Sequence, residues 1–392
     1  MTLDTDHTAQ TSDLVTRALA RALDDGPALL PLPAEPEAER ARLVAALRPE
    51  EPLEDDSVAL IVPTSGSTGT PKGVLLSAAS LRASATATHQ RLGGPGRWLL
   101  ALPARHIAGL QVLTRSLLAG RQPVLLDSAA GFRTDLFAAA ARETLADGDR
   151  CYTSLVPTQL SRLVAENGPG LAELCRFDAV LCGGAATPPS LLAAARAAGV
   201  NVRTTYGMSE TAGGCVYDGH PLDGVRFRPD RVGVAAPVGL SGPMLALGYR
   251  LDPEQSEASF AHGWFQTGDF GEMDEQGVLH IIGRTDELIN TGGAKVAPQL
   301  VEQVLTAQPG VAEACVVGLP DPEWGAVVAA LVVPTDPARP PAEEGLRAAV
   351  REKLGAVAAP KSYRLASELP LRGPGKVDRR AVRSLLSAEQ QG

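Results

Sequence analysis

The densest group of side chains able to do chemistry is a run of glycines and hydroxyl-bearing residues at positions 64–73. It reads Thr-Ser-Gly-Ser-Thr-Gly-Thr-Pro-Lys-Gly and follows an apolar, β-branched segment at 58–62 that predicts a buried strand. Glycines let backbone N–H groups converge, hydroxyls add donors and lysine adds charge, which together suit a polyphosphate. No Gly-Lys-Ser/Thr occurs, so this is not a P-loop, and a flexible Gly/Ser turn is the alternative. The candidate phosphate-binding residues are Thr64, Ser65, Gly66, Ser67, Thr68, Gly69 and Lys72.

Two further motifs place an aromatic ring and a carboxylate at the ends of predicted strands. Residues 182–185 read Cys-Gly-Gly-Ala after a strand predicted at 179–182, and residues 204–211 read Thr-Thr-Tyr-Gly-Met-Ser-Glu-Thr after one predicted at 200–204. An aromatic face suits a base, and a carboxylate suits a hard cation. Residues 207–211 also approach the G-x-S-x-G elbow of serine hydrolases, but position 211 is Thr. A buried Tyr and a solvated Glu are the alternatives.

Four shorter motifs follow. Residues 267–269 read Thr-Gly-Asp in a predicted turn, residues 283–286 read Gly-Arg-Thr-Asp, residues 290–298 read Asn-Thr-Gly-Gly-Ala-Lys-Val-Ala-Pro, and residues 370–378 read Pro-Leu-Arg-Gly-Pro-Gly-Lys-Val-Asp. In this order the motifs resemble the adenylate-forming superfamily of acyl-CoA synthetases, adenylation domains and luciferases, over residues 58–382. The resemblance implies an enzyme that uses ATP to convert a carboxylate into an acyl-adenylate and then passes the acyl group to coenzyme A.

The resemblance also implies roles for residues on the nucleotide side. Tyr206 would stack on adenine, Thr211 would contact the phosphate of AMP, and Glu210 would help to hold Mg²⁺. Asp269 would bind both ribose hydroxyls, a task that suits a carboxylate because it accepts a hydrogen bond from each. The backbone of Gly183, Gly184 and Ala185 would pack on adenine, and Arg284 would reach the ribose or phosphate region. Gly207 and Met208 complete the nucleotide-side residues.

The remaining motifs resemble parts of the superfamily that move. Asp286 occupies the hinge position, where a residue must absorb a large change in φ and ψ. Gly292, Gly293 and Lys295 lie on the loop that swings to the site for thioester formation, and the glycines would allow close approach of the pantetheine arm. Lys376 matches the lysine that bridges the attacking carboxylate and the α-phosphate, although a single lysine near a C-terminus is ordinarily a surface residue.

Three segments indicate which acid is activated. Residues 102–110, 153–160 and 213–219 resemble the o-succinylbenzoate–CoA ligases of menaquinone (vitamin K2) biosynthesis in their short actinobacterial form. His106 could donate a hydrogen bond to a keto or carboxylate oxygen as part of the catalytic group, and a hydrogen-bonded core histidine is the alternative. Gln159 would lie on the substrate side. Arg162 could face the second carboxylate, for which a solvated helix face is the favoured alternative. Another aryl or medium-chain acid, loading of a carrier protein, and a non-catalytic nucleotide-binding relative also stay open.

The elements that must position these residues alternate between strand and helix. Strands are predicted at 58–62, 98–102, 123–126, 179–182, 200–204 and 278–282, with helices at 110–119, 136–144, 158–166 and 189–198. This alternation predicts an α/β fold with βαβ units and a largely parallel sheet. Residues 298–305 begin a smaller α+β block, so we predict a large N-terminal domain over 1–285 and a small mobile C-terminal domain over 286–392.

Composition excludes several other classes of protein. The 392 residues carry a net charge of −9 and contain no long basic run, which disfavours nucleic acid and anionic membranes as partners. The apolar run at 326–333 is too short to span a bilayer, and the N-terminus carries no secretory signal. Five cysteines without a C-x-x-C pair predict reduced thiols in a cytoplasmic protein. Whether the chain forms a homodimer is left open.

Overall fold

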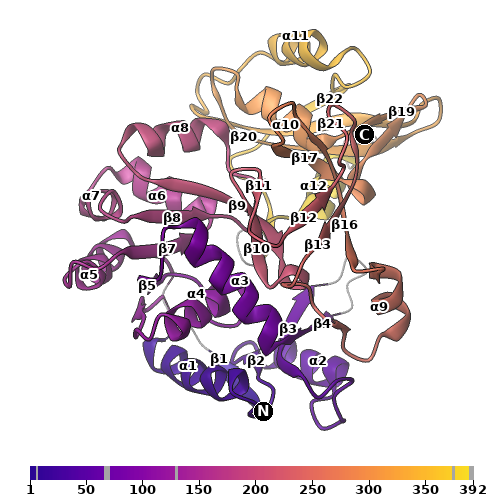
Figure 1. Ribbon diagram of the computed structural model, residues 1–392. Helices are drawn as coiled ribbons and strands as arrows, with labels where there is room; N and C mark the ends of the chain where they lie inside the picture. The colour runs from indigo at the N-terminus through magenta and orange to yellow at the C-terminus, as the bar shows by residue number, and fades with distance from the viewer. Residues whose placement is uncertain (6–7, 66–70, 129–130, 373–375, 388–392) are drawn as a thin grey trace. The chain divides into compact units, whose positions relative to one another are not determined.

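The computed structural model describes residues 1–5, 8–65, 71–128, 131–372 and 376–387 (Figure 1). The chain divides into two compact units, one made of Met1–Arg228 and Gly239–Thr267 and the other of Pro229–Val238 and Gly268–Gly392. The division passes through β13 (Ala236–Ser241) and β16 (Trp264–Met273). The domain boundary expected at Asp286 from the sequence stays a prediction.

A seven-stranded sheet forms the centre of the first unit. Its order is β11-β10-β9-β8-β7-β5-β6, in which β6, β5, β7, β8 and β9 run parallel while β10 and β11 are antiparallel additions. The predicted parallel sheet is therefore confirmed, although β7 was not among the predicted strands. The strands are β5 (Arg97–Leu100), β6 (Val124–Leu125), β7 (Cys151–Leu155), β8 (Ala179–Cys182), β9 (Val202–Met208), β10 (Gly213–Tyr217) and β11 (His220–Pro221).

Helices cover both faces of this sheet (Figure 1). Alternate strand residues such as Leu99 and Val180 point toward Phe137 and the other helix residues of one buried cluster. On the opposite face the rings of Trp98 and Tyr152 are in contact, with their centroids 5.0 Å apart and their planes tilted by 47°. Helices α5 (Thr134–Thr144), α6 (Pro157–Glu166), α7 (Pro169–Leu174) and α8 (Pro189–Ala197) pack on the first face, and α3 (Ala78–Arg91) and α4 (Ile107–Leu118) on the second.

An antiparallel hairpin carries both ends of the predicted phosphate loop. It consists of β3 (Val58–Ser65) and β4 (Pro71–Ser77), with β14 (Gly248–Tyr249) paired to β4. The strand predicted at 58–62 continues to Ser65, and Pro63 is accommodated opposite Gly73. Thr64 and Ser65 therefore lie on β3 and Lys72 lies on β4, which corrects the expectation that they belong to a loop.

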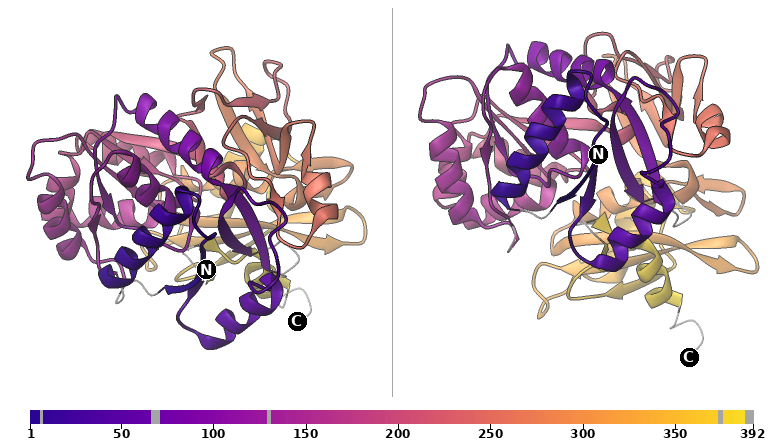
Figure 2. Two further views of the ribbon diagram at one scale, coloured as in Figure 1. Left: turned by 60° about the horizontal axis from the view of Figure 1, so that its bottom comes forward. Right: turned by 90° about the horizontal axis from the view of Figure 1, so that it is seen from below.

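The N-terminal segment adds a small layer beside this hairpin (Figure 2). Strand β1 (Thr2–Thr5) pairs in parallel with β2 (Leu30–Pro33), and α1 (Ala9–Leu23) and α2 (Glu37–Leu47) accompany them. Arg250 is buried, which is tolerated because its guanidinium has full hydrogen bonding. It donates to the carbonyls of Leu47, Arg48, Glu51 and Pro52 and pairs with Glu54 at 2.9 Å.

Short strands and one helix complete the first unit. Strand β12 (Arg226–Arg228) pairs with β13 from Arg226↔Ser241 to Arg228↔Gly239, and β15 (Phe260–Ala261) pairs with the start of β16. Helix α9 (Pro253–Ser259) follows β14 and is capped by Asp252, whose side chain accepts a hydrogen bond from Gln255 N. A 3-10 turn, η1 (Ser209–Thr211), joins β9 to β10.

The second unit centres on a long hairpin. Strands β20 (Val311–Asp321) and β21 (Gly325–Pro334) pair over their whole lengths, and β22 (Ser362–Leu365) adds in parallel to β21. The buried Val and Leu side chains of the two faces pack against α10 (Pro298–Thr306) and α11 (Glu343–Leu354) on one side and α12 (Arg379–Ser387) on the other. The smaller elements are β17 (Leu279–Arg284), η2 (Thr285–Glu287), β18 (Ile289–Thr291), β19 (Ala294–Val296), β23 (Leu371–Arg372) and β24 (Lys376–Val377).

One local expectation is wrong. Residues 267–269 lie inside β16 and do not form a turn, since Asp269 pairs in register with Arg284 of β17. The Thr-Gly-Asp composition is typical of turns, but here Gly268 takes a φ of +74° within a paired strand.

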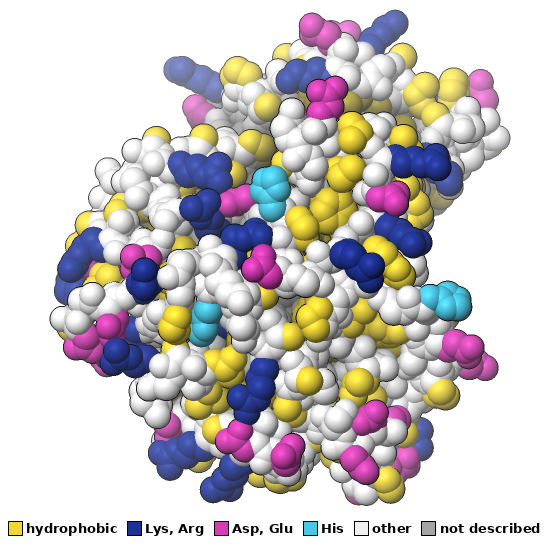
Figure 3. Space-filling model, viewed as in Figure 1, with side chains coloured by type: hydrophobic (Ala, Val, Ile, Leu, Met, Phe, Trp, Pro, Cys, Tyr) yellow, Lys and Arg dark blue, Asp and Glu magenta, His cyan; other side chains and the backbone are white. Residues whose placement is uncertain are grey.

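The surface is mixed in charge. On the face shown in Figure 3, basic and acidic side chains are interspersed and do not gather into one basic patch. No helix among the residues that the structure describes is long and apolar enough to cross a membrane.

Candidate active site

The phosphate-loop hairpin brings Lys72 against an aromatic ring. Lys72 Nζ lies 5.1 Å from the ring centroid of Tyr249 and donates to Gln255 Oε1 at 3.2 Å. At the base of the hairpin, Thr64 Oγ1 donates to the carbonyl of Lys72 at 3.4 Å. Of the predicted loop, Gly66, Ser67, Thr68 and Gly69 lie outside the described residues, and Ser65 is described in its backbone alone.

Tyr249 connects this lysine to the predicted metal-binding carboxylate. Its hydroxyl donates to Glu210 Oε1 at 3.0 Å. Burial, and secondly the charge of Glu210, raises the pKa of Tyr249 above its usual value, so the hydroxyl stays a donor at neutral pH. Sequence reasoning brought Lys72 and Glu210 into one site but missed Tyr249, which belongs to none of the motifs.

Glu210 itself sits in the tight turn η1. Thr211 is fully buried, and its Oγ1 accepts from Met208 N at 2.9 Å and donates to Gly213 O at 2.8 Å. The hydroxyl thus closes the turn that presents Glu210. Contact of Thr211 with the phosphate of AMP stays a prediction.

Glycines allow the strands around Tyr206 to approach closely. A Cβ at Gly207 would lie 2.2 Å from Gly213 O, and one at Gly183 would lie 2.2 Å from Thr205 Oγ1. Strand β9, which carries Tyr206, therefore approaches Gly213 and Gly183 more closely than a side chain at Gly207 or Gly183 would allow. Gly184, with a φ of +81°, and Ala185 follow Gly183 and are exposed.

The predicted acid side is built at the start of α4. His106 is the residue that precedes the helix. The first turn of α4 packs closely on the segment before it, because a Cβ at Gly109 would lie 2.2 Å from Pro103 O. A Cβ at Gly213 would lie 3.3 Å from Gln111 Cγ. The first turns of α4 therefore lie against the turn that carries Glu210, as the assignment of His106 to the site requires.

The other two predicted substrate residues have structural contacts. Gln159 Oε1 accepts from Val156 N at 3.0 Å and its Nε2 donates to Ala101 O at 2.9 Å, so its amide holds the start of α6. Arg162 is exposed and donates to Phe132 O at 3.3 Å. Roles in binding the acid stay predictions for both.

In the second unit, β16 and β17 bring Asp269, Arg284 and Asp286 together. Arg284 Nη1 lies 3.4 Å from Asp269 Oδ1, and its Nε lies 2.9 Å from Asp286 Oδ1. Burial lowers the pKa of Arg284, but the hydrogen bond and charge of Asp286 outweigh it and leave the pKa raised. The proposed hinge residue is thus tied to the arginine before it.

The predicted thioester loop lies under a tryptophan. Gly292 and Gly293 connect β18 to β19, and a Cβ at Gly292 would lie 2.5 Å from Trp324 Cε3. Lys361 Nζ lies 4.1 Å from the ring of Trp324, which remains about one third exposed. Lys295 is exposed on β19. Sequence reasoning missed Trp324, which lies in a separate hairpin turn.

The C-terminal lysine lies next to a strongly anchored arginine. Lys376 starts β24, which pairs with β23, and its side chain is outside the description. Arg379, at the start of α12, reaches Glu302 Oε1 at 2.6 Å and Oε2 at 3.0 Å, Val316 O at 2.8 Å and Glu287 Oε2 at 3.2 Å. This fork fixes the segment after Lys376 to α10 and η2.

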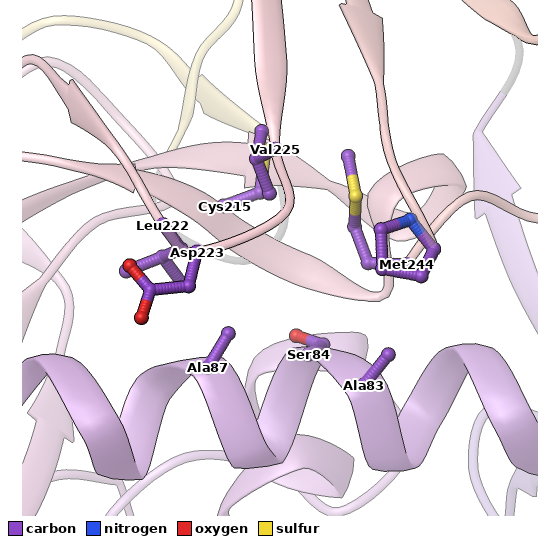
Figure 4. Close-up of a pocket in the computed structure, with 9 residues that line it drawn as sticks. Ala83, Ser84, Ala87, Cys215, Leu222, Asp223, Val225 and Met244 are labelled. Carbon is purple, nitrogen blue, oxygen red and sulfur yellow. The ribbon is translucent and has the colours of Figure 1, made fainter.

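A small pocket lies elsewhere in the first unit, between α3 and residues 215, 222–225 and 243–244 (Figure 4). Ser84 and Ala87 of α3 point toward Val225 and Met244 across it. None of the predicted site residues lines this pocket. Cys215 does line it, and burial raises the pKa of that thiol to about 12, which makes it a poor nucleophile.

The comparisons with known proteins now define the class. The AMP-binding enzyme family matches residues 3–241, and the AMP-binding enzyme C-terminal domain matches residues 300–376. The chain belongs to the AMP-binding enzyme family, which confirms the superfamily and the fold predicted from the motifs.

Individual proteins show which members of the family this chain resembles. The chain is 48% identical over 373 residues, 94% of each chain, to a probable 2-succinylbenzoate–CoA ligase of Mycobacterium tuberculosis. It resembles the o-succinylbenzoate CoA synthetase MenE of Bacillus subtilis, solved with the acyl-adenylate OSB-AMP, at a TM-score of 0.78 and 26% identity, covering 97% of this chain and 87% of that one. It also resembles the amide bond synthetase McbA of Marinactinospora thermotolerans, at a TM-score of 0.80 and 29% identity, covering 98% and 88%.

Proposed function

We propose that this chain is a 2-succinylbenzoate–CoA ligase of menaquinone biosynthesis. It would convert the acid and ATP to acyl-AMP and pyrophosphate, and then acyl-AMP and CoA to the thioester and AMP. The observation that carries the proposal is the 48% identity to a ligase of that name over 94% of both chains. The grouping of Lys72, Tyr249 and Glu210 in one unit supports it, because it places a cation and a carboxylate together as triphosphate chemistry requires.

In the first half-reaction a carboxylate oxygen of the acid attacks the α-phosphorus, and the bond to pyrophosphate breaks. Negative charge gathers on phosphoryl oxygens, so fixed positive groups lower the barrier. We assign Lys72 to the departing phosphates and Lys376 to the carboxylate and α-phosphate. Tyr206 would hold adenine and Asp269, with Arg284 beside it, would hold the ribose.

Magnesium fits the donors of the first unit. No cluster of three or more acidic, His or Cys side chains suited to a metal occurs among the described residues. Glu210 offers one carboxylate oriented by Tyr249, and Mg²⁺ is commonly held by one or two carboxylates together with substrate phosphates. A bound Mg²⁺ would neutralise phosphate charge, and the part of Glu210 would be to hold it in place.

In the second half-reaction the CoA sulfur attacks the acyl carbon and AMP leaves. We propose that a rotation near Asp286 replaces Lys376 by the loop of Gly292, Gly293 and Lys295 at the reacting centre. The loop's closeness to Trp324, with Lys361 over the ring, supports a pantetheine path there, since an amphipathic arm favours a partly exposed aromatic wall. The proposal places the reaction in the cytoplasm, a reducing compartment that keeps free cysteines such as Cys182 in the thiol form.

Mass spectrometry of the CoA products tests the function. Purified chain is incubated with ATP, Mg²⁺, CoA and equal amounts of o-succinylbenzoate, benzoate and octanoate. The proposal expects the o-succinylbenzoyl thioester to dominate and to require ATP. A product distribution without preference for that acid would reject the assignment of substrate, and no thioester with any acid would reject ligase activity.

An amide synthetase is the second candidate, because the likeness to McbA is as strong in fold as that to MenE. The same incubation with simple amines in place of CoA separates the two. Amide formation faster than thioester formation would favour this candidate.

A further inference from the structure

The segment that ends at Tyr249 joins the predicted metal-binding turn to the phosphate-loop hairpin within the first unit. Ala246 N donates to the carbonyl of Glu210 at 2.9 Å, and Tyr249 OH donates to the carboxylate of the same residue at 3.0 Å. In the other direction, Leu247 N donates to Leu75 O at 2.9 Å and Tyr249 pairs in register with Val74 of β4. The segment thus holds the backbone and the side chain of Glu210 at a fixed place beside β4.

The ring of Tyr249 is itself held firmly. It is 6% exposed, its centroid lies 5.7 Å from that of Phe260, and its backbone N–H donates to Ser256 Oγ at 2.8 Å. Lys72 Nζ lies 5.1 Å from the ring centroid. One side chain therefore presents its face to the lysine and its hydroxyl to the carboxylate.

We propose that Tyr249 is a positioning residue that presets the separation between the Lys72 ammonium and the Glu210 carboxylate for a metal-bound nucleoside triphosphate. The inference rests on the proposed function in so far as the ligand is such a nucleotide. The physical reason is that opposite charges attract each other, so a lysine and a glutamate that contact the same side chain need that side chain to fix their positions. The ring face contacts the ammonium, and the hydroxyl orients the carboxylate by donating to it, so one rigidly held side chain fixes the places of both groups.

The hydroxyl can be removed without the ring. Tyr249→Phe keeps the contact with Lys72 and the packing on Phe260, and deletes the bond to Glu210. Hydrogen bonds to charged groups are worth enough that metal-dependent binding should weaken by about tenfold or more. Tyr249→Leu also removes the contact with Lys72, and should weaken binding of the nucleotide without metal as well.

The test measures binding and not turnover. The full chain is titrated with α,β-methylene-ATP by calorimetry with and without Mn²⁺, and bound Mn²⁺ is followed by its electron paramagnetic resonance. We expect Tyr249→Phe to lose Mn²⁺-dependent affinity and to change the Mn²⁺ spectrum, while metal-free affinity stays within twofold of wild type. The matched control is Tyr217→Phe, which deletes a buried hydroxyl bonded to Thr88 at 3.0 Å and should leave both affinities unchanged.

A double variant separates positioning from general damage. If Tyr249 acts through Glu210, Tyr249→Phe should have no further effect on Mn²⁺-dependent affinity once Glu210→Gln is present. Additive losses, equal losses in the Tyr217→Phe control, or unchanged Mn²⁺-dependent affinity in Tyr249→Phe would each overturn the inference. Failure of o-succinylbenzoate as substrate would reject the proposed function and leave this result standing, because no acid or CoA is present. Absence of nucleotide binding by the wild-type chain would overturn both.

Discussion

Two arginines in the second unit are surrounded by carboxylates, yet they are held in different ways. Arg379 makes a bidentate fork to Glu302 with contacts of 2.6 and 3.0 Å, adds a carbonyl, and is mostly buried. Arg284 is 40% exposed and divides its contacts between Asp269 at 3.4 Å and Asp286 at 2.9 and 3.5 Å.

The difference separates a structural arginine from one that can exchange partners. Short, buried, two-point pairs are strong and directional, whereas long and exposed pairs are weakened by solvent. Arg379 therefore fixes the start of α12, while Arg284 leaves its two aspartates able to take other partners. This is the behaviour that a ribose-binding Asp269 and a hinge at Asp286 would need.

The largest effect is expected at Asp269. Asp269→Asn removes the charge that would accept two ribose hydroxyls, so kcat/KM for ATP in pyrophosphate exchange should fall by about 100-fold. The melting temperature should change little, because the arginine partner is partly solvated. A large loss of melting temperature with normal exchange would show that the Arg284 side of the comparison is structural too.

The second-largest effect is expected at Arg379, the arginine whose carboxylate partners are fixed. Arg379→Gln leaves Glu302 without its fork, and the free energy of unfolding measured in urea should fall by about 3 kcal/mol. Arg383→Gln, on the exposed face of the same helix, is the control and should cost under about 0.5 kcal/mol. Equal small effects from the two variants would contradict the static role given to Arg379.

His89 in the first unit is a buried base that contrasts with both arginines, because its Nε2 has no hydrogen-bond partner in the part of the chain that the structure describes. Burial, then the charge of Arg115, lowers the pKa of His89 from 6.5 to about 4. The unfolded chain binds a proton below pH 6.5 and the folded chain does so only near pH 4, so stability is lost as the pH falls between these values. We expect a loss on the order of 2 kcal/mol over that window.

Urea unfolding at pH 7, 5.5 and 4.5 measures this loss. His89→Gln should flatten the His89 part of the slope, whereas His220→Gln, at an exposed position, should keep it. An unchanged slope in His89→Gln would assign the acid sensitivity to other groups.

The smallest change in stability is expected at the hinge position. Asp286→Ala breaks an exposed pair and should alter the free energy of unfolding by under about 1 kcal/mol. If residue 286 is the hinge, the variant should change the ratio of the rates of acyl-AMP formation and of CoA transfer from supplied acyl-AMP, each followed by quenched-flow. An unchanged ratio would count against a hinge at this residue.

The sequence predicted the fold where apolar periodicity is strong and missed elements where it is absent. Helix α3 was overlooked because Ser80, Ser84 and Thr88 are buried along it, so it shows no apolar stripe. Strand β7 was passed over for its polar Thr153 and Ser154, which are buried and hydrogen-bonded or packed inside the sheet. Both elements take their stability from surroundings that a local pattern does not contain.

The residues of the candidate site likewise fall into a group that the sequence predicted and a group that it did not. Short motifs predicted Lys72, Glu210 and Asp269 as site residues, because each motif contains the residue types that its proposed chemistry needs. Motifs could not identify Tyr249 and Trp324, because each contacts a residue that is distant in the sequence. Only the folded backbone brings these residues together. Gln159 was predicted to lie on the acid side; its amide oxygen accepts from Val156 N at the start of α6 and its amide nitrogen donates to Ala101 O, contacts that no motif indicated.

The absence of a side chain at Gly109 bears on how this enzyme could be redesigned. Even a methyl group there would press on the carbonyl of Pro103 and displace the entry to α4, and His106 with it. Attempts to reshape the proposed acid-binding end to admit a bulkier or smaller acid should therefore leave position 109 untouched and vary the walls contributed by other elements.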